Sequence, residues 1–253
     1  MLDHRPFLLF IHGFMGSARE FETLAARSFH DYSYGCFLLP GHDEVPIDSR
    51  TNWKTVADAI SQYLDKKDVA QAVLVGYSMG GRMALGMAHL HPGRVAGLVL
   101  TSVNPGLATA EDRQQRLTAD QQLVQRLKES DFEAFLADWY AQPLFGSLQS
   151  KSVYRDVLVH RQAQNPQALA QAAVQLSIAH HPDFQPMAGR LQKPVLLLTG
   201  GADKKAVGLA KDWQAKWPSL RWVSMPHAGH AVYVEQPNTW AMAIRDFLLA
   251  ETV

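Results

Sequence analysis

The sequence predicts an α/β fold, with a mostly parallel central sheet flanked by helices and a helical lid insertion. Short apolar runs bounded by glycine or proline alternate with segments of helical spacing. Because these runs are continuous, they are typical of strands buried on both faces, as in a parallel sheet covered by helices. The chain has 253 residues, 47% of them hydrophobic, which is enough for one such domain with an insertion.

Six apolar runs account for the predicted strands. They lie at residues 7–11, 37–39, 72–75, 95–100, 194–198 and, as a weaker run, 220–225. The segment after the third run, residues 82–90, has the pattern of a helix. Cys36 is the single cysteine, and we expect it in a buried strand. It can form neither an intramolecular disulfide nor a cysteine-based zinc site, which fits a reducing cytoplasm.

The region between the fourth and fifth runs differs from the rest of the chain. Residues 109–191 contain no strand-like run, and their apolar residues recur near helical spacing. We therefore predict a core of residues 1–108 and 192–253 and a helical insertion of residues 109–191. Ligands of open α/β folds bind at the carboxyl ends of the strands, so we expect the helical insertion to form a lid there.

Charge and length exclude several classes of function. The 24 Lys and Arg residues balance 24 Asp and Glu residues, so no global field attracts nucleic acid or anionic lipid, although local arginines can still hold an acidic ligand. The first apolar run is too short for a membrane span and lacks the features of a signal peptide. We expect a cytoplasmic protein that binds neither nucleic acid nor a membrane. The sequence leaves the oligomeric state open, and a monomer is compatible with it.

The strongest functional signal is a serine between glycines, directly after the third predicted strand. Residues 76–81 have the sequence Gly-Tyr-Ser-Met-Gly-Gly and precede a predicted helix, which is the context that the G-x-S-x-G motif requires. The glycines allow a tight turn that exposes the serine hydroxyl. We predict that Ser78 is catalytic rather than an incidental residue of a glycine-rich turn.

Two further residues complete a candidate catalytic triad. A serine needs an imidazole to take its proton and a carboxylate to orient that imidazole. Asp203 follows the fifth predicted strand and His230 follows the sixth, in the chain order that this motif predicts. We expect Ser78 and His230 to lie within about 2.6–3.2 Å of each other. Rival candidates at less favourable places are His227, Asp183 and Asp212.

A second turn offers backbone donors for a developing negative charge. The sequence His-Gly-Phe at residues 12–14 ends the first predicted strand, and such a turn commonly supplies an N–H group to an oxyanion hole. We expect the backbone N–H groups of Phe14 and Met79 to form this pair. We predict a structural hydrogen-bonding role for His12 and a packing role for residues 40–43. The alternative for His42 is a place near the pocket mouth.

Together, residues 10–16, 39–43, 76–82 and 200–230 resemble the α/β-hydrolase superfamily over essentially the whole chain. The resemblance implies the fold but leaves the reaction open. Esterases, lipases, dehalogenases, peroxidases, carbon–carbon hydrolases and lyases all share this triad.

Arg82, four residues after the serine, is a more discriminating feature. A cation in the first turn of a helix opposes the helix dipole at a cost of about 0.3–1 kcal/mol, and such a violation suggests function. The side chain either binds a substrate carboxylate beside Ser78 or reaches water at the surface. Composition does not decide between these, because residues 111–161 contain seven Lys and Arg against eight Asp and Glu.

Motifs in and around the helical insertion narrow the resemblance. They are residues 76–82, Asn-Pro-Gly-Leu at 104–107, Arg113 and Arg116 ahead of residues 124–126, and Asp-Trp-Tyr-Ala-Gln-Pro-Leu-Phe at 138–145. These motifs look like those of the 2-succinyl-6-hydroxy-2,4-cyclohexadiene-1-carboxylate (SHCHC) synthases of menaquinone biosynthesis. The resemblance implies a lyase that removes pyruvate from a cyclohexene bearing succinyl, enolpyruvyl and ring carboxylates.

The same resemblance implies a set of substrate-binding residues. They are Tyr77, Arg82, Arg116, Trp139, Tyr140, Arg161 and Lys205. The cationic members would bind the carboxylates, and the aromatic members would form walls of the pocket. Arg161 matches the family pattern only after a shift of one residue.

In the implied mechanism, His230, oriented by Asp203, makes Ser78 basic enough to abstract a ring proton, and pyruvate is expelled. No acyl-enzyme forms, and neither a metal nor an organic cofactor is required. The main rival is a serine hydrolase of a small ester, thioester or carbon–carbon bond. A binding protein without turnover is a third possibility, against which the complete triad argues.

Overall fold

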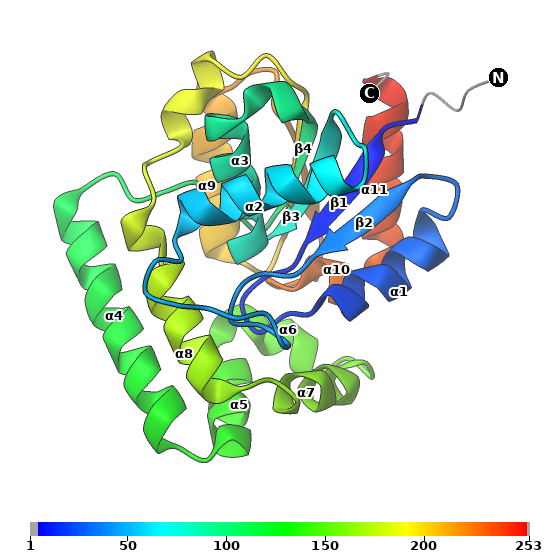
Figure 1. Cartoon of the computed structure of the whole chain (residues 1–253). Coiled ribbons are helices and arrows are strands. Elements are labelled where there is room, and N and C mark those ends of the chain that lie inside the picture. Colours follow the sequence, from blue (N-terminus) through cyan, green and yellow to red (C-terminus); the bar gives the residue numbers. More distant parts are fainter. Residues whose placement is uncertain (1–4, 252–253) are drawn as a thin grey trace.

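The computed structural model describes residues 5–251, which form a sheet of six parallel strands with helices on both faces (Figure 1). The spatial order is β2-β1-β3-β4-β5-β6, and neighbouring strands are parallel throughout. The strands are β1 (Phe7–Ile11), β2 (Tyr34–Phe37), β3 (Ala72–Tyr77), β4 (Val95–Thr101), β5 (Val195–Gly200) and β6 (Arg221–Met225). The predicted α/β class is therefore confirmed.

The prediction was wrong at the second strand, which begins and ends earlier than residues 37–39. Strand β2 lies at the edge of the sheet, and its residues alternate between half-buried and buried. An edge strand of this kind has no continuous apolar run to mark it. The other edge strand, β6, is fully buried only at Met225, which explains why its apolar signal was weak. Strand β3 is buried along its whole length.

Two layers of helices cover the sheet (Figure 1). Helices α1 (Ala18–Ser28) and α11 (Pro237–Ala250) pack on one face, where Phe10 contacts Phe21 and Trp240. Helices α2 (Trp53–Lys66), α3 (Met79–Leu90) and α9 (Lys204–Lys216) pack on the other. Alternate residues of each strand point to opposite layers, so both layers pack against apolar side chains.

Between β4 and β5 the chain forms only helices and turns. They include α4 (Ala110–Glu129), α5 (Phe132–Tyr140), α6 (Gly146–Gln149), α7 (Tyr154–Gln162) and α8 (Pro166–Gln175). Side chains of Thr109, Asp131 and Asn165 cap the first turns of α4, α5 and α8. Figure 1 shows these helices gathered beyond one end of the sheet. Their apolar side chains form a separate cluster that also includes Met15 and Ala231 of the core.

A buried amide joins the helical insertion to the loop after β2. Gln164 accepts a hydrogen bond from the Asp43 N–H at 2.8 Å, and its Nε2 donates to Asp43 Oδ1 at 2.7 Å. Gln164 is 5% exposed. This contact connects residues that are 121 positions apart in the sequence.

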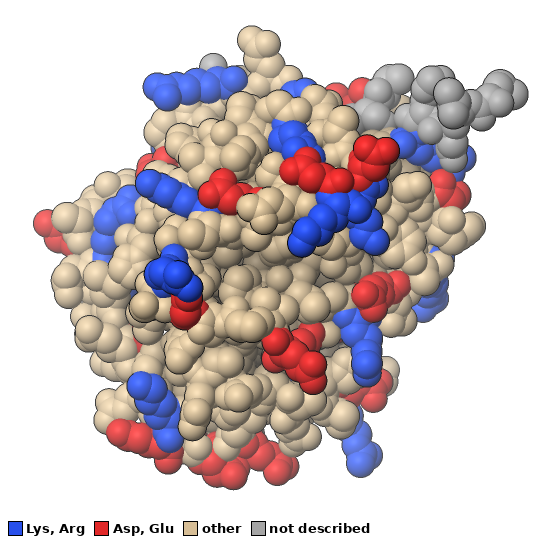
Figure 2. Space-filling view, viewed as in Figure 1, with Lys and Arg blue, Asp and Glu red and all other residues tan. Residues whose placement is uncertain are grey.

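On the face in Figure 2, basic and acidic side chains are interspersed rather than gathered by sign. Within residues 5–251, no helix combines the length and apolar character needed to cross a membrane.

Candidate active site

Ser78 lies at a sharp turn between β3 and α3. Its φ of 49° places it in a region that non-glycine residues rarely adopt, which is typical of strained functional positions. The turn depends on close backbone approach, because a Cβ atom on Gly80 would lie 2.2 Å from the Ile11 carbonyl oxygen. Helix α3 begins at the next residue, Met79, and so presents its N-terminal N–H groups beside the serine.

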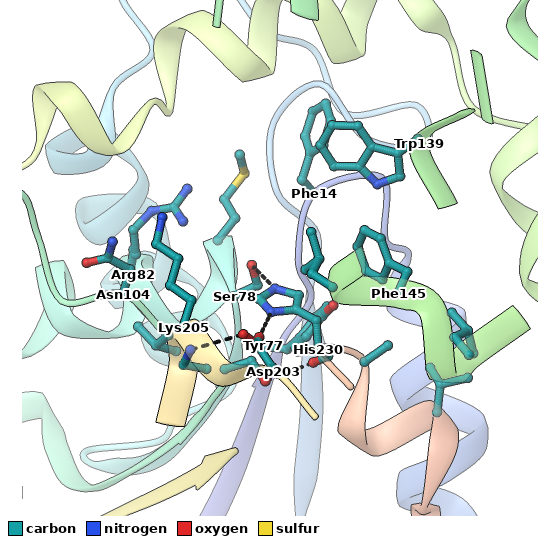
Figure 3. Close-up of a pocket in the computed structure, with 18 of the residues that line it drawn as sticks. Phe14, Tyr77, Ser78, Arg82, Asn104, Trp139, Phe145, Asp203, Lys205 and His230 are labelled. Atoms are coloured by element: carbon teal, nitrogen blue, oxygen red, sulfur yellow. Dashed lines mark hydrogen bonds and ion pairs between the residues drawn. The ribbon is translucent and has the colours of Figure 1, made fainter. Parts of the chain in front are cut away.

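Three side chains that follow three different strands form one hydrogen-bonded chain (Figure 3). Ser78 Oγ lies 3.1 Å from His230 Nε2, and His230 Nδ1 lies 2.7 Å from Asp203 Oδ2. The carboxylate holds the proton of the imidazole on Nδ1, so that Nε2 is free to accept the serine proton. His227, the rival candidate, is exposed and does not line the cavity described below.

Asp203 is held in its ionised form by hydrogen bonds. Burial alone would raise the pKa of Asp203, but hydrogen bonds from His230 and from the Ala206 N–H outweigh it, and the pKa is lowered. The Ala206 N–H donates to Oδ1 at 3.0 Å, because Asp203 also caps helix α9. The carboxylate therefore keeps its negative charge beside His230.

The loop that carries His230 is fixed from three directions. The His230 N–H donates to the Leu144 carbonyl of the helical insertion at 3.1 Å, and the Ser102 hydroxyl donates to the His230 carbonyl at 2.8 Å. The Gly229 N–H lies 3.0 Å from both carboxylate oxygens of Glu235, on α10 (Val232–Glu235). The position of the imidazole thus depends on both the core and the insertion.

Two buried histidines clamp the predicted oxyanion loop. His12 Nδ1 donates to the Gly13 carbonyl at 2.9 Å, while its Nε2 accepts from the Leu39 N–H. Since C=O and N–H of a trans peptide point in opposite directions, this bond turns the Phe14 N–H away from His12. His42 Nε2 accepts from the Met15 N–H at 3.0 Å and fixes the following peptide. His12 and His42 thus have structural hydrogen-bonding roles.

Both histidines must be neutral to accept these N–H groups. Burial lowers the pKa of His42 to about 4 and the pKa of His12 well below its ordinary value. The centroids of the His12 and His42 rings lie 4.9 Å apart. At neutral pH each ring therefore keeps one donor and one acceptor nitrogen for the backbone.

A cavity of about 290 Å³ opens onto Ser78, between the strand ends and the helical insertion. All of the site residues predicted from the sequence line it: Phe14, Tyr77, Ser78, Met79, Arg82, Arg116, Trp139, Tyr140, Arg161, Asp203, Lys205 and His230. In Figure 3, Arg82 and Lys205 lie on one side of Ser78, and Phe14 and Trp139 on another.

Arg82 is a buried cation that forms no ion pair with any of residues 5–251. It is 7% exposed, and its Nε has no hydrogen-bond partner among the described residues. Burial, followed by the nearby positive charge of Arg116, lowers the pKa of Arg82 to about 9, so the guanidinium remains charged at neutral pH. An unpaired buried cation in a cavity favours an anionic ligand.

The other two arginines have carboxylate partners. Arg116 Nε donates to Asp120 at 2.8 Å, and the Arg116 side chain is 41% exposed. Arg161 is buried and forms a two-pronged ion pair with Glu20 of α1, and its Nε donates to the Tyr140 hydroxyl at 3.1 Å. Arg161 thus lines the cavity, but it does not offer the free charge that the resemblance implied.

Several lining residues were not predicted as site residues. They include Ser102, Asn104, Phe145 and Tyr233. Asn104 lies just beyond the carboxyl end of β4, so the rule that ligands bind at such ends was signal enough to find it. The partnership of Glu20 with Arg161 had no comparable signal.

Among residues 5–251, no group of three or more His, Cys, Asp or Glu side chains is arranged to hold a metal ion.

Comparison with known proteins places the chain among enzymes. Residues 6–237 match the model of the alpha/beta hydrolase fold family. An SHCHC synthase of Serratia proteamaculans (strain 568) is 33% identical over 97% of this chain and 94% of its own length. An SHCHC synthase of Escherichia coli O1:K1 / APEC is 32% identical over 92% of this chain and 89% of its own length. The solved structure of MenH from S. aureus has a TM-score of 0.91 at 28% identity, covering 98% of this chain and 95% of that one. The chain therefore belongs to the α/β hydrolase fold family and is an enzyme similar to the SHCHC synthases.

Proposed function

We propose that this protein is an SHCHC synthase of menaquinone biosynthesis. It would eliminate pyruvate from 2-succinyl-5-enolpyruvyl-6-hydroxy-3-cyclohexene-1-carboxylate and leave 2-succinyl-6-hydroxy-2,4-cyclohexadiene-1-carboxylate. The observation that carries the proposal is the buried, unpaired Arg82 in the same cavity as Ser78. A hydrolase of neutral esters has no need of this charge, whereas a polycarboxylate substrate does. The names of the relatives described above agree with this choice.

In the proposed reaction, Ser78 acts as a base. Its 3.1 Å contact with His230 lets the imidazole take the hydroxyl proton as the serine oxygen removes a proton from the ring. The electron pair of the broken C–H bond moves through the conjugated system, and the C–O bond to the enolpyruvyl group breaks. The leaving enolate takes up a proton and becomes pyruvate. That proton comes from the His230 imidazolium, because Ser78 already holds the proton removed from the ring, and no water enters the products.

Negative charge that develops on the succinyl carbonyl would be stabilised by the Phe14 and Met79 N–H groups. The clamps from His12 and His42 hold this loop before substrate arrives, which is the preorganisation that such donors need. The substrate carboxylates would bind near Arg82, Arg116 and Lys205. The aromatic rings of Phe14 and Trp139, whose centroids are 5.8 Å apart, would exclude water from another side.

Release of pyruvate from the authentic substrate tests the proposal directly. We expect turnover by the wild-type enzyme and none above background by Ser78→Ala. Ser150→Ala, at an exposed serine of the helical insertion, is the matched control and should keep wild-type activity. Absence of pyruvate, together with a burst of nitrophenol from p-nitrophenyl esters, would instead support the serine hydrolase.

A hydrolase remains the second candidate because the same triad and backbone donors suit acyl transfer. The two reactions differ in their intermediates. A deuterium label at the abstracted ring position should slow single turnover if proton removal limits the lyase reaction, and the protein should stay unmodified under turnover. A covalent adduct on Ser78, or oxygen-18 from water in the product acyl group, would reject the lyase mechanism.

A further inference from the structure

The ion pair between Arg161 and Glu20 joins the helical insertion to the core at the wall of the cavity. Arg161 lies on α7 and Glu20 on α1, 141 residues apart. Their side chains are 5% and 13% exposed. The pair is two-pronged, with Arg161 Nη2 at 3.0 Å from Glu20 Oε2. A pair in this geometry, shielded from water, leaves almost no net charge at this part of the wall.

Two tyrosines hold the pair in place. The Tyr233 hydroxyl donates to Glu20 Oε2 at 2.7 Å, and Arg161 Nε donates to the Tyr140 hydroxyl at 3.1 Å. A guanidinium has five N–H donors, and three of those of Arg161 are occupied by Glu20 and Tyr140. The remaining N–H donors belong to a side chain that lines the cavity and that has the Tyr233 hydroxyl as a further hydrogen-bonding neighbour. Arg161 therefore keeps the capacity to donate hydrogen bonds while its charge is compensated.

Three other cations line the cavity among its apolar residues. Arg82 has no carboxylate partner among the described residues, and Lys205 lines the same cavity without an ion pair in the described chain. Arg116 shares its charge with Asp120 but is 41% exposed. We call these three residues the cationic side, and Arg161, Glu20, Tyr140 and Tyr233 the compensated side.

We propose that Glu20 is a specificity-determining residue, which makes the Arg161 wall of the cavity electrically neutral and so directs the carboxylates of a ligand to the cationic side. The compensated side would then accept a neutral group, such as a carbonyl or hydroxyl oxygen, through the remaining N–H donors of Arg161. This inference rests on the proposed function in one respect, namely that the natural ligand is a polycarboxylate.

The alternative is that Arg161 binds a ligand carboxylate in place of Glu20. That exchange would leave the Glu20 carboxylate largely buried with only the Tyr233 hydroxyl as partner. An uncompensated buried carboxylate is strongly unfavourable, so the exchange would oppose ligand binding. The structure therefore favours a ligand that leaves the ion pair intact.

The test compares the affinity of one probe, propane-1,2,3-tricarboxylate, for a set of variants by isothermal titration calorimetry. Glu20→Gln keeps the shape of the side chain and removes its charge, which leaves Arg161 uncompensated. We expect this variant to bind the probe about tenfold more tightly than wild type at low salt, with a smaller gain at high salt. Glu22→Gln is the matched control, because it removes the same charge from an exposed position on the same helix and should leave the affinity unchanged.

A double variant separates charge compensation from direct binding by Arg161. Glu20→Gln/Arg161→Gln removes both charges together, so it leaves no buried ion unpaired and remains usable if a single substitution unfolds the protein. We expect its affinity for the probe to stay within about threefold of wild type. A loss of tenfold or more would show that Arg161 itself binds a carboxylate, and it would overturn the inference. Unchanged affinity in folded Glu20→Gln would overturn it as well.

These measurements do not depend on the reaction. If wild type releases no pyruvate but Glu20→Gln binds the probe more tightly, the proposed function is wrong and the role of Glu20 stands. If wild type is an active synthase and Glu20→Gln shows no gain, the role of Glu20 is wrong and the proposed function stands.

Discussion

The core and the helical insertion position their functional groups in different ways. Ser78 directly follows β3 and its N–H donates to Thr101 of β4, whereas Asp203 and His230 lie on the loops after β5 and β6. Arg116 and Arg161 instead project from helices of the insertion and are held by single carboxylates, Asp120 and Glu20. Under the proposed function, the core supplies the triad together with the cations Arg82 and Lys205, and the insertion adds Arg116 and the Trp139 wall of the cavity. Substitutions in the triad should lower kcat, and substitutions of a cation in the insertion should raise KM.

The largest effect is expected at the triad carboxylate. In Asp203→Asn, the amide can still accept from the Ala206 N–H but no longer holds the His230 proton on Nδ1. We expect kcat to fall by about 10³–10⁴-fold with little change in KM, as judged by pyruvate release. Asp212→Asn, an exposed substitution on the same helix, should be silent. Equal losses in both variants would contradict the assignment of Asp203.

The next effect concerns the oxyanion loop. His42→Leu removes the acceptor of the Met15 N–H and frees the peptide after Phe14. We expect kcat to fall about 10²-fold, in the range for loss of one oxyanion donor, while KM stays near wild type. His42→Gln restores an acceptor and should recover part of the loss. A change confined to KM would show that the loop serves binding rather than the transition state.

The buried histidine also makes stability depend on pH. The pKa of His42 is about 4 in the folded protein, against 6.5 for an unperturbed histidine, so the unfolded chain binds more protons between these values. The contribution of neutral His42 to the free energy of unfolding is therefore fully present above about pH 6.5. It falls by roughly 3 kcal/mol as the pH is lowered toward 4. Urea unfolding of wild type and His42→Gln should differ in slope across this window. Parallel curves would exclude His42 as the source.

A smaller effect is expected at Arg82, which lies on the core but serves recognition. Arg82→Met removes a buried charge and retains most of the volume. We expect kcat/KM to fall tenfold or more, as for the loss of a charged hydrogen bond, with Tm unchanged or slightly raised because the charge opposes the dipole of α3. A sharp drop in Tm with near-normal kinetics would make Arg82 structural, and the proposed polycarboxylate site would lose its best support.

The smallest effect is expected at Arg116. Its side chain is 41% exposed and already shares its charge with Asp120, so solvent screens much of its attraction for a ligand. Arg116→Met should raise KM by about threefold at constant kcat. Comparison of Arg116→Met with Arg82→Met in one steady-state assay measures how much burial increases the attraction of an arginine for the ligand. If Arg116→Met is the more damaging, exposure is not what ranks the two arginines.

The parts of the molecule that the sequence predicted are those governed by local rules. Buried strands such as β3 are recognisable in the sequence as continuous apolar runs. A residue just past such a strand must lie at the carboxyl edge of a parallel sheet. The Arg116–Asp120 pair follows the i, i+4 spacing of a helix and was open to the same reasoning. Strand β2 escaped because only half of its residues are buried.

The charge state of Arg161 could not be predicted in this way. Its partner, Glu20, lies 141 residues earlier and meets it only after the insertion packs on α1. No periodicity or motif connects two such positions. An arginine at this position indicated a side chain that binds an anion. The packing of α7 on α1 makes Glu20, a residue of the protein, the partner of Arg161.

The place at which the insertion leaves the sheet has a consequence for evolution and design. Strands β4 and β5 are hydrogen-bonded neighbours, with Leu98 opposite Val195, so the chain departs and returns on adjacent strands. A segment inserted between β4 and β5 can therefore differ between related sheets without a change in strand order. Two of the buried side-chain contacts between the insertion and the core limit the transplant of this insertion into a related sheet. A transplanted insertion that carries Arg161 and Gln164 needs Glu20 and Asp43 in the recipient core. Without them, Arg161 would be buried without an ion pair, and Gln164 would lose its hydrogen bonds to Asp43.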